Sequence, residues 1–90
     1  MVDRLIFGQN TDVDAAAEVI VGGDNPIKAI VVKAMSTNTG IIYVGLSTVL
    51  TTTGFELEAG ESIMFECDNL SQVYVIASIA NQKVCYVGIN

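Results

Sequence analysis

Few side chains in this chain could carry chemistry: there are two cysteines, three tyrosines and ten acidic residues, and histidine is absent. Without histidine, a His-dependent base, a catalytic triad and the metal ligands of a cupin-like enzyme are excluded. Two cysteines alone are too few for a four-ligand zinc site. We therefore expect no enzyme and no cofactor.

A cysteine nucleophile needs a neighbouring base or cation that lowers the thiol pKa. Cys67 lies between Glu66 and Asp68, whose negative charges raise it, and Cys85 has only Lys83 two positions away. Both cysteines lie in apolar, strand-like segments, so we expect buried free thiols in a reducing compartment. A disulfide between neighbouring strands remains the alternative, because pairing cannot be derived from sequence.

Acidic residues gather around one expected hairpin. Glu56 and Glu58 share a strand face, and Glu66 shares it on the partner strand. Paired carboxylates can hydrolyse glycosides, and clustered oxygens can bind calcium. These glutamates lie on the expected solvent face of the hairpin, and the chain has no Trp to wall a sugar cleft. We expect a solvated acidic face, with adventitious calcium as the alternative.

Composition indicates a subunit of an assembly. Of the 90 residues, 51% are hydrophobic, and the mean hydropathy is +0.53. A domain of this size hides only about 60% of its unfolded surface. The surplus is expected at an interface with another chain, the alternative being a monomer with an apolar surface. With a net charge of −6 and four scattered basic residues, neither nucleic acid nor a membrane is expected as a partner.

β-Branched residues are abundant, and turn signals recur about every ten residues, which is typical of a sandwich or barrel of short strands. We expect an all-β, antiparallel β-sandwich with seven or eight short strands. Residues 17–90 would form the sandwich, and residues 1–16 an N-terminal arm or edge segment. Strands are expected at 4–7, 17–21, 27–35, 41–44, 55–58, 62–67, 72–79 and 82–89, with 45–54 as a loop or a weak edge strand.

The strands at 55–58 and 62–67 are expected to pair as a hairpin through the three-residue loop Ala59–Glu61. This loop length places Phe55 opposite Phe65 and Leu57 opposite Ile63, all on one face. A loop one residue shorter would scatter the apolar set between faces.

The strands at 27–35 and 72–79 are apolar on both faces, and so is most of the strand at 82–89, which predicts burial on both sides. Such strands are the expected subunit interface, with two tyrosines as anchors. The predicted interface residues are Ile30, Val32, Val73, Tyr74, Val75, Tyr86, Val87 and Ile89.

Four segments, Asn38–Gly45, Phe55–Ser62, Asp68–Leu70 and Val73–Ala77, resemble small β-sandwich virion proteins of tailed bacteriophages, of the capsid decoration (cement) type. The resemblance covers roughly residues 19–87. It implies a jelly-roll-like subunit, commonly a homotrimer, that is made in the bacterial host cytoplasm and contacts the major capsid protein on the capsid exterior. The alternative is a binding module of a phage tail or fibre for carbohydrate or a host surface, which predicts exposed aromatic residues along a groove.

Overall fold

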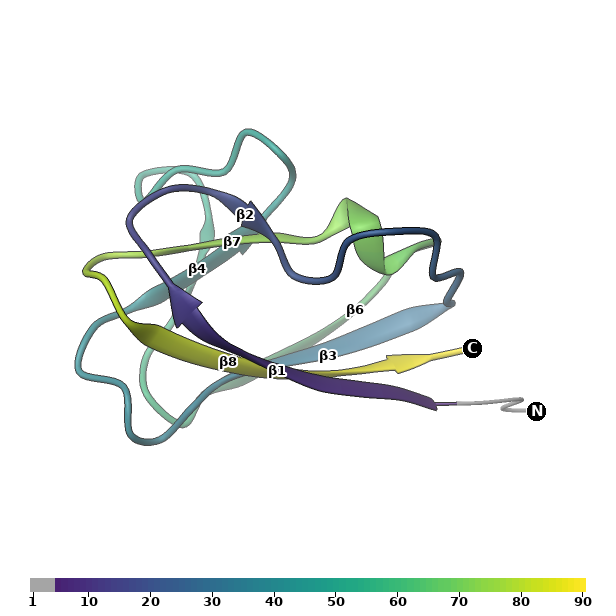
Figure 1. Ribbon diagram of the computed structural model, residues 1–90, viewed down its shortest axis with the longest axis horizontal. Coiled ribbons are helices and arrows are strands. Elements are labelled where there is room, and N and C mark those ends of the chain that lie inside the picture. Colours follow the sequence, from purple (N-terminus) through teal and green to yellow (C-terminus); the bar gives the residue numbers. More distant parts are fainter. Residues whose placement is uncertain (1–4) are drawn as a thin grey trace.

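The structure, a computed structural model, describes residues 5–90 and contains eight strands in two four-stranded antiparallel sheets (Figure 1). The all-β prediction is confirmed. The strands are β1 (Leu5–Val13), β2 (Glu18–Val19), β3 (Ala29–Ala34), β4 (Ile42–Gly45), β5 (Phe55–Leu57), β6 (Ser62–Glu66), β7 (Tyr74–Ala77) and β8 (Gln82–Ile89). A single 3₁₀ turn, η1 (Leu70–Gln72), precedes β7 within these residues.

The two halves of the chain pair with each other in reverse order. β1 pairs with β8, β2 with β7, β3 with β6 and β4 with β5. Two further pairings, β3 with β8 and β4 with β7, complete the sheets. The first sheet has the order β1-β8-β3-β6 and the second the order β2-β7-β4-β5, so every connection except β4–β5 crosses between the sheets.

The hairpin predicted for residues 55–67 is wrong. The tight turn exists, since the Glu61 amide donates to the Glu58 carbonyl at 2.9 Å and Gly60 has a φ of 86°. However, β5 pairs with β4 and β6 pairs with β3, so the turn carries the chain from one sheet to the other. Leu57 and Ile63 both contact the core, but from opposite sheets. Alternation of apolar residues is satisfied equally by strands that face each other and by strands that pair.

The first strand is longer than predicted. β1 does not end at Phe7 but continues through Gly8, Gln9 and Asn10, and Gly8 pairs with Tyr86. A Cβ atom on Gly8 would overlap the Tyr86 ring, so this glycine makes room for a cross-strand aromatic instead of ending the strand. In the segment 1–16, residues 5–13 form this edge strand and Val13 is fully buried, whereas residues 1–4 lie outside the described part.

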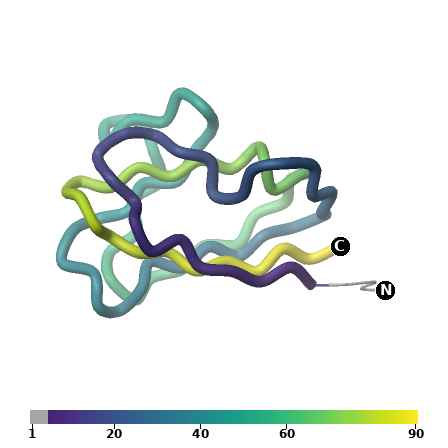
Figure 2. The backbone as a smooth tube through the Cα atoms, in the orientation of Figure 1, coloured from purple at the N-terminus to yellow at the C-terminus, as the bar shows by residue number. Residues whose placement is uncertain are grey.

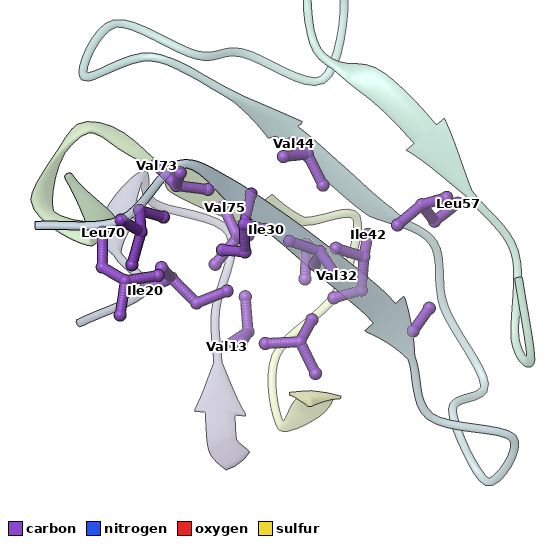
Figure 3. Close-up of a cluster of buried hydrophobic side chains, with 14 residues drawn as sticks. Val13, Ile20, Ile30, Val32, Ile42, Val44, Leu57, Leu70, Val73 and Val75 are labelled. Carbon is purple, nitrogen blue, oxygen red and sulfur yellow. The ribbon is translucent and has the colours of Figure 1, made fainter. Parts of the chain in front are cut away.

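The inward faces of both sheets meet in one core (Figure 3). Figure 3 shows Ile30 and Val32 of β3 lying among Ile42 of β4 and Val75 of β7. The accessible area of 5008 Å² is close to the about 5,050 Å² expected for a folded monomer of 9.5 kDa. The single chain therefore exposes about as much surface as a typical folded monomer of its mass.

Burial on both faces holds for one of the strands for which it was predicted and fails for another. β7 is buried on both sides, with Val75 and Ala77 toward the core and Ile76 only 6% exposed on the other face. On β3 the inward side chains are fully buried, but Val31 on the outward face is only half-buried and Lys33 is exposed. Apolar composition alone does not reveal which outer face is covered.

A buried glutamine holds the connection between β3 and β4. The Gln82 side-chain carbonyl accepts the backbone amides of Thr39 and Gly40 at 2.9 and 2.8 Å, and its amide donates to the Ala80 carbonyl at 3.0 Å. The side chain of Asn38, in this loop, donates to the backbone carbonyl of Lys83 on β8 and accepts the Lys83 backbone amide. In Figure 2 the beginning of β1 (purple) runs beside the end of β8 (yellow), in agreement with the pairing of Leu5 with Ile89.

Candidate interaction surface

One outer face of the molecule carries an apolar row across a whole sheet. Phe7, Val87, Val31 and Met64 are cross-strand neighbours on β1, β8, β3 and β6. Phe7 is 70% exposed and Met64 67% exposed at the two edge strands, while the valines between them are half-buried. The register thus places four apolar side chains side by side on the surface.

The neighbouring rows define the limits of this patch. On one side lie Leu5, Ile89 and Ala29, followed by the exposed Glu66. On the other side lie polar residues, Gln9, Lys33 and Ser62, with Cys85 among them. We call the patch the bare face, and it consists of Leu5, Phe7, Ala29, Val31, Met64, Val87 and Ile89. Contiguous exposed apolar patches on small proteins mark sites of interaction.

The outer face of the second sheet is covered by the chain itself. Tyr43 and Gly45 point outward from β4, and Val49 from the loop 46–54 packs over Gly45, where a Cβ atom would lie 2.7 Å from a Val49 methyl group. Val49 is only 4% exposed. The loop is tied internally by bonds from the Val49 amide to the Leu46 carbonyl at 2.9 Å and from the Gly54 amide to the Leu50 carbonyl at 2.9 Å. We call residues 46–54 the covering loop (Figure 2, teal).

The residues predicted for the interface do not form one surface. Ile30, Val32, Val73 and Val75 are at most 2% exposed and belong to the core of this chain, so their burial needs no partner. Tyr74 is half-buried and pairs with Gly45 on the outer face of the second sheet, and Tyr86 points inward and packs against the core beside Gly8. Of the predicted set, Val87 and Ile89 lie on the bare face.

Sequence reasoning missed Phe7, Leu5 and Met64 as surface residues. Each lies on an edge strand at an outward position. The signal that could have found them is cross-strand register with β8 and β3, because alternation within a single strand does not say which face meets solvent.

A groove opens between the two sheets at the edges of β5 and β6. It has a volume of about 820 Å³ and is lined mainly by apolar side chains, among them Val44, Phe55, Ile63, Phe65 and Val73. Its polar lining consists of Lys28, Glu66, Asp68 and Gln72, with Cys67 among them. Phe55 points to the same side of β5 as the buried Leu57, yet it is 56% exposed.

The two cysteines are free and half-buried. Cys67 lies in the groove, where partial burial raises the pKa of its thiol, a backbone hydrogen bond from Asn69 opposes this, and the charge of Asp68 raises the pKa further. The sequence argument expected the acidic neighbours to raise this pKa; burial is the larger cause. Cys85 lies on the outer face of the first sheet, with its Sγ 3.8 Å from the Lys33 carbonyl oxygen. A thiol with a raised pKa is a poor nucleophile, so Cys67 is not activated.

The expected acidic face is divided between the two sheets. Glu56 lies on β5, Glu66 on β6, and Glu58 at the turn, all exposed. Because the hairpin does not form, no shared face brings the three together. Residues 5–90 contain no group of three or more His, Cys, Asp or Glu side chains arranged to hold a metal ion, and no helix in them is long and apolar enough to cross a membrane.

Comparison of the chain with protein-family models, curated proteins and solved structures gave no match.

Proposed function

We propose that this chain is a structural subunit, without a catalytic role, that assembles with copies of itself through the bare face. The observation that carries the proposal is the row Phe7–Val87–Val31–Met64, whose two ends are more than two-thirds exposed. Burying a Phe or Met side chain contributes about 1.5–3 kcal/mol each, and a partner seated on the row buries both.

The size of the face suits such a contact. A standard interface takes about 800 Å² from each partner, roughly one-sixth of the 5008 Å² of accessible surface. One outer face of a two-layer molecule is of this order. Lys33 and Glu66 lie at the border of the patch, where charged groups set orientation more than affinity.

We further propose that the two sheets form a jelly-roll β-sandwich. Support comes from the pairing of each strand with its counterpart from the other end of the chain, β1 with β8 through β4 with β5. Winding one long hairpin of eight strands into two sheets produces this order, which belongs to the jelly roll.

A fold does not by itself imply a function. Jelly rolls are common in viral capsids, however, and the sequence resemblance to phage decoration proteins agrees with that use. We therefore propose a homotrimer on the exterior of a bacteriophage capsid, bound to the major capsid protein.

Measurement of mass in solution tests the assembly. Light scattering from about 1 µM to about 1 mM should show a species larger than 9.5 kDa, and three times this mass for the trimer. The double variant Phe7→Lys/Met64→Lys should weaken association by about 100-fold or more while the melting temperature stays close to the wild-type value, because both side chains are exposed in the single chain.

The matched control is Leu50→Lys/Ile79→Lys, which adds the same charge at residues that are 55% and 49% exposed outside the bare face. It should associate like the wild type. A wild-type protein that stays monomeric over the whole range, or a control that dissociates as much as the Phe7/Met64 variant, would show that the bare face does not mediate self-assembly.

One observation favours the second candidate, a binding module for carbohydrate. The groove holds one exposed aromatic residue, Phe55, of the kind that such a module predicts, beside the half-buried Phe65. Binding on a glycan array that is lost in Phe55→Ala would support it.

A further inference from the structure

We propose that the groove between β5 and β6 receives an extended apolar segment of another polypeptide, with basic residues at the end that lies beside Glu66 and Asp68. The site shares the strand β6 with the bare face but is lined by the inward side chains of that strand, and the inference does not depend on self-assembly through the bare face.

The core is uncovered at this corner of the molecule. Leu57 is 2% exposed, but Phe55, on the same side of β5, is 56% exposed. Across the groove, Ile63 and Phe65 pack against the core and remain half-buried. The inward side chains of both edge strands are therefore left partly in water, and a segment seated between them would complete the core.

Both walls of the groove are sheet edges. Within residues 5–90, β5 has β4 as its one neighbour and β6 has β3. The Cys67 amide and the Glu61 carbonyl bond to Lys28 and Ala34 on the β3 side. By alternation, the backbone groups of Ser62, Met64 and Glu66 point away from β3, so an extended segment can pair with them.

One end of the groove has an acidic rim. Glu66 and Asp68 at one end of the groove are exposed, and the single cation in its lining is Lys28. The chain as a whole carries −6. A segment with Lys or Arg at this end is complementary to the rim, and an acidic one is repelled.

A peptide fits this lining better than a sugar does. A sugar hydroxyl group that is buried without a hydrogen-bond partner costs free energy, and the walls here are mostly apolar. The Gln72 side-chain oxygen is already used, since it accepts the amides of Asp68 and Asn69 at 3.0 and 3.2 Å.

The probe is a synthetic peptide of about nine residues that alternates valine and threonine and carries a lysine pair at its N-terminus. β6 runs toward the acidic rim, so an antiparallel peptide brings its N-terminus there. One control peptide has glutamates in place of the lysines, and another has a central proline that prevents strand pairing.

Binding is read by the fluorescence anisotropy of the labelled peptide, and its location by iodoacetamide alkylation of both cysteines in the same molecule. The lysine peptide should bind with a Kd of about 1 mM or lower, slow alkylation of Cys67 in the groove by about tenfold, and leave Cys85 unchanged. Both control peptides should bind at least about tenfold more weakly.

The decisive variant is Phe55→Glu, and its matched control is Leu50→Glu, because the two side chains are 56% and 55% exposed and Leu50 does not line the groove. Phe55→Glu should abolish binding and Leu50→Glu should retain it. The inference is overturned if the lysine peptide does not bind, if Phe55→Glu leaves binding unchanged, or if a glycan occupies the groove instead. If rising protein concentration slows the alkylation of Cys85 and the peptide does not affect the alkylation of Cys67, the result would support self-assembly through the bare face and reject the groove site.

Discussion

The outer faces of the two sheets differ in how far their apolar side chains are shielded from water. Each sheet carries apolar side chains on the side that turns away from the core, among them Ile76 and Tyr43 on the second sheet and Val31 and Val87 on the first. On the second sheet, Val49 of the covering loop packs on that side, and Ile76 is 6% exposed. On the first sheet, Phe7 and Met64 remain at least two-thirds exposed.

This difference shows that apolar residues outside the core of a small domain can be covered in two ways. A loop of the same chain can cover one sheet, which uses residues for that purpose alone. The outer face of the other sheet stays exposed and leaves apolar surface that only another chain can cover. Total hydrophobicity therefore indicates that cover is needed, and the arrangement of the loops decides whether that cover comes from inside the chain.

The largest expected effect comes from placing the same charge on each face. Val49→Asp puts a carboxylate where the side chain is 4% exposed, and it should lower the free energy of unfolding by about 2–3 kcal/mol because the covering loop loses its anchor. Val31→Asp, on the half-buried bare face, should cost under about 1 kcal/mol in a dilute sample. Urea unfolding of both variants measures the difference.

Binding of a hydrophobic dye adds a second readout for this pair. Val49→Asp should increase dye binding because Tyr43, which the covering loop approaches at Gly54, becomes accessible, and Val31→Asp should reduce it. Equal losses of stability in the two variants would mean that the two faces are equally covered, and the comparison would fail.

A smaller effect is expected from adding one methyl group at Gly54, at the end of the covering loop. A Cβ atom at Gly54 would lie 2.6 Å from the Tyr43 Cβ, 2.7 Å from a Val49 methyl group and 3.2 Å from the Leu50 carbonyl oxygen. The Leu50 carbonyl oxygen is a backbone atom and cannot move aside as a flexible side chain can. Gly54→Ala should therefore lower the free energy of unfolding by about 1–2 kcal/mol, measured in thermal or urea unfolding.

Gly22→Ala is the matched substitution, because nothing lies within 4 Å of its Cβ position. It should be neutral or stabilise by up to about 1 kcal/mol through the unfolded chain. If Gly54→Ala proved equally neutral, the loop would not be packed against the sheet.

The sequence predicted local structure well where the signal is local. The sequence predicts a loop or a weak edge strand at 45–54, and residues 46–54 form a loop; the strands near 29–34, 42–45 and 82–89 follow from turn residues and β-branched composition. The inward set Ile30, Val32 and Ala34 follows from alternation alone. These features depend only on neighbours along the chain.

Features that depend on distant partners could not be derived. The turn at 58–61 was found, but a tight turn does not say whether its flanking strands join one sheet or two. Phe7 and Met64 meet in one surface row only through β8 and β3, which requires a register spanning nearly the whole chain. The covering role of Val49 was hidden for the same reason, because a Ser- and Thr-rich loop gives no sign of what lies beneath it.

The smallest expected effect tests whether a half-buried side chain in this protein is shielded from water. The two valines in the middle of the bare face are half-buried to a similar degree. Burial and Asp68 raise the pKa of the Cys67 thiol above its ordinary value of 9.0. The folded protein then keeps this proton to a higher pH than the unfolded chain does, so the stabilisation is present below about pH 9 and is lost as pH rises. Urea midpoints at about pH 8 and about pH 10 should fall more in the wild type than in Cys67→Ser. Cys85→Ser keeps the Cys67 thiol and should retain the wild-type fall. If Cys67→Ser and the wild type lose stability in parallel, half-burial in this fold leaves the thiol hydrated, and the half-buried valines of the bare face would then have more surface to gain from burial by a partner.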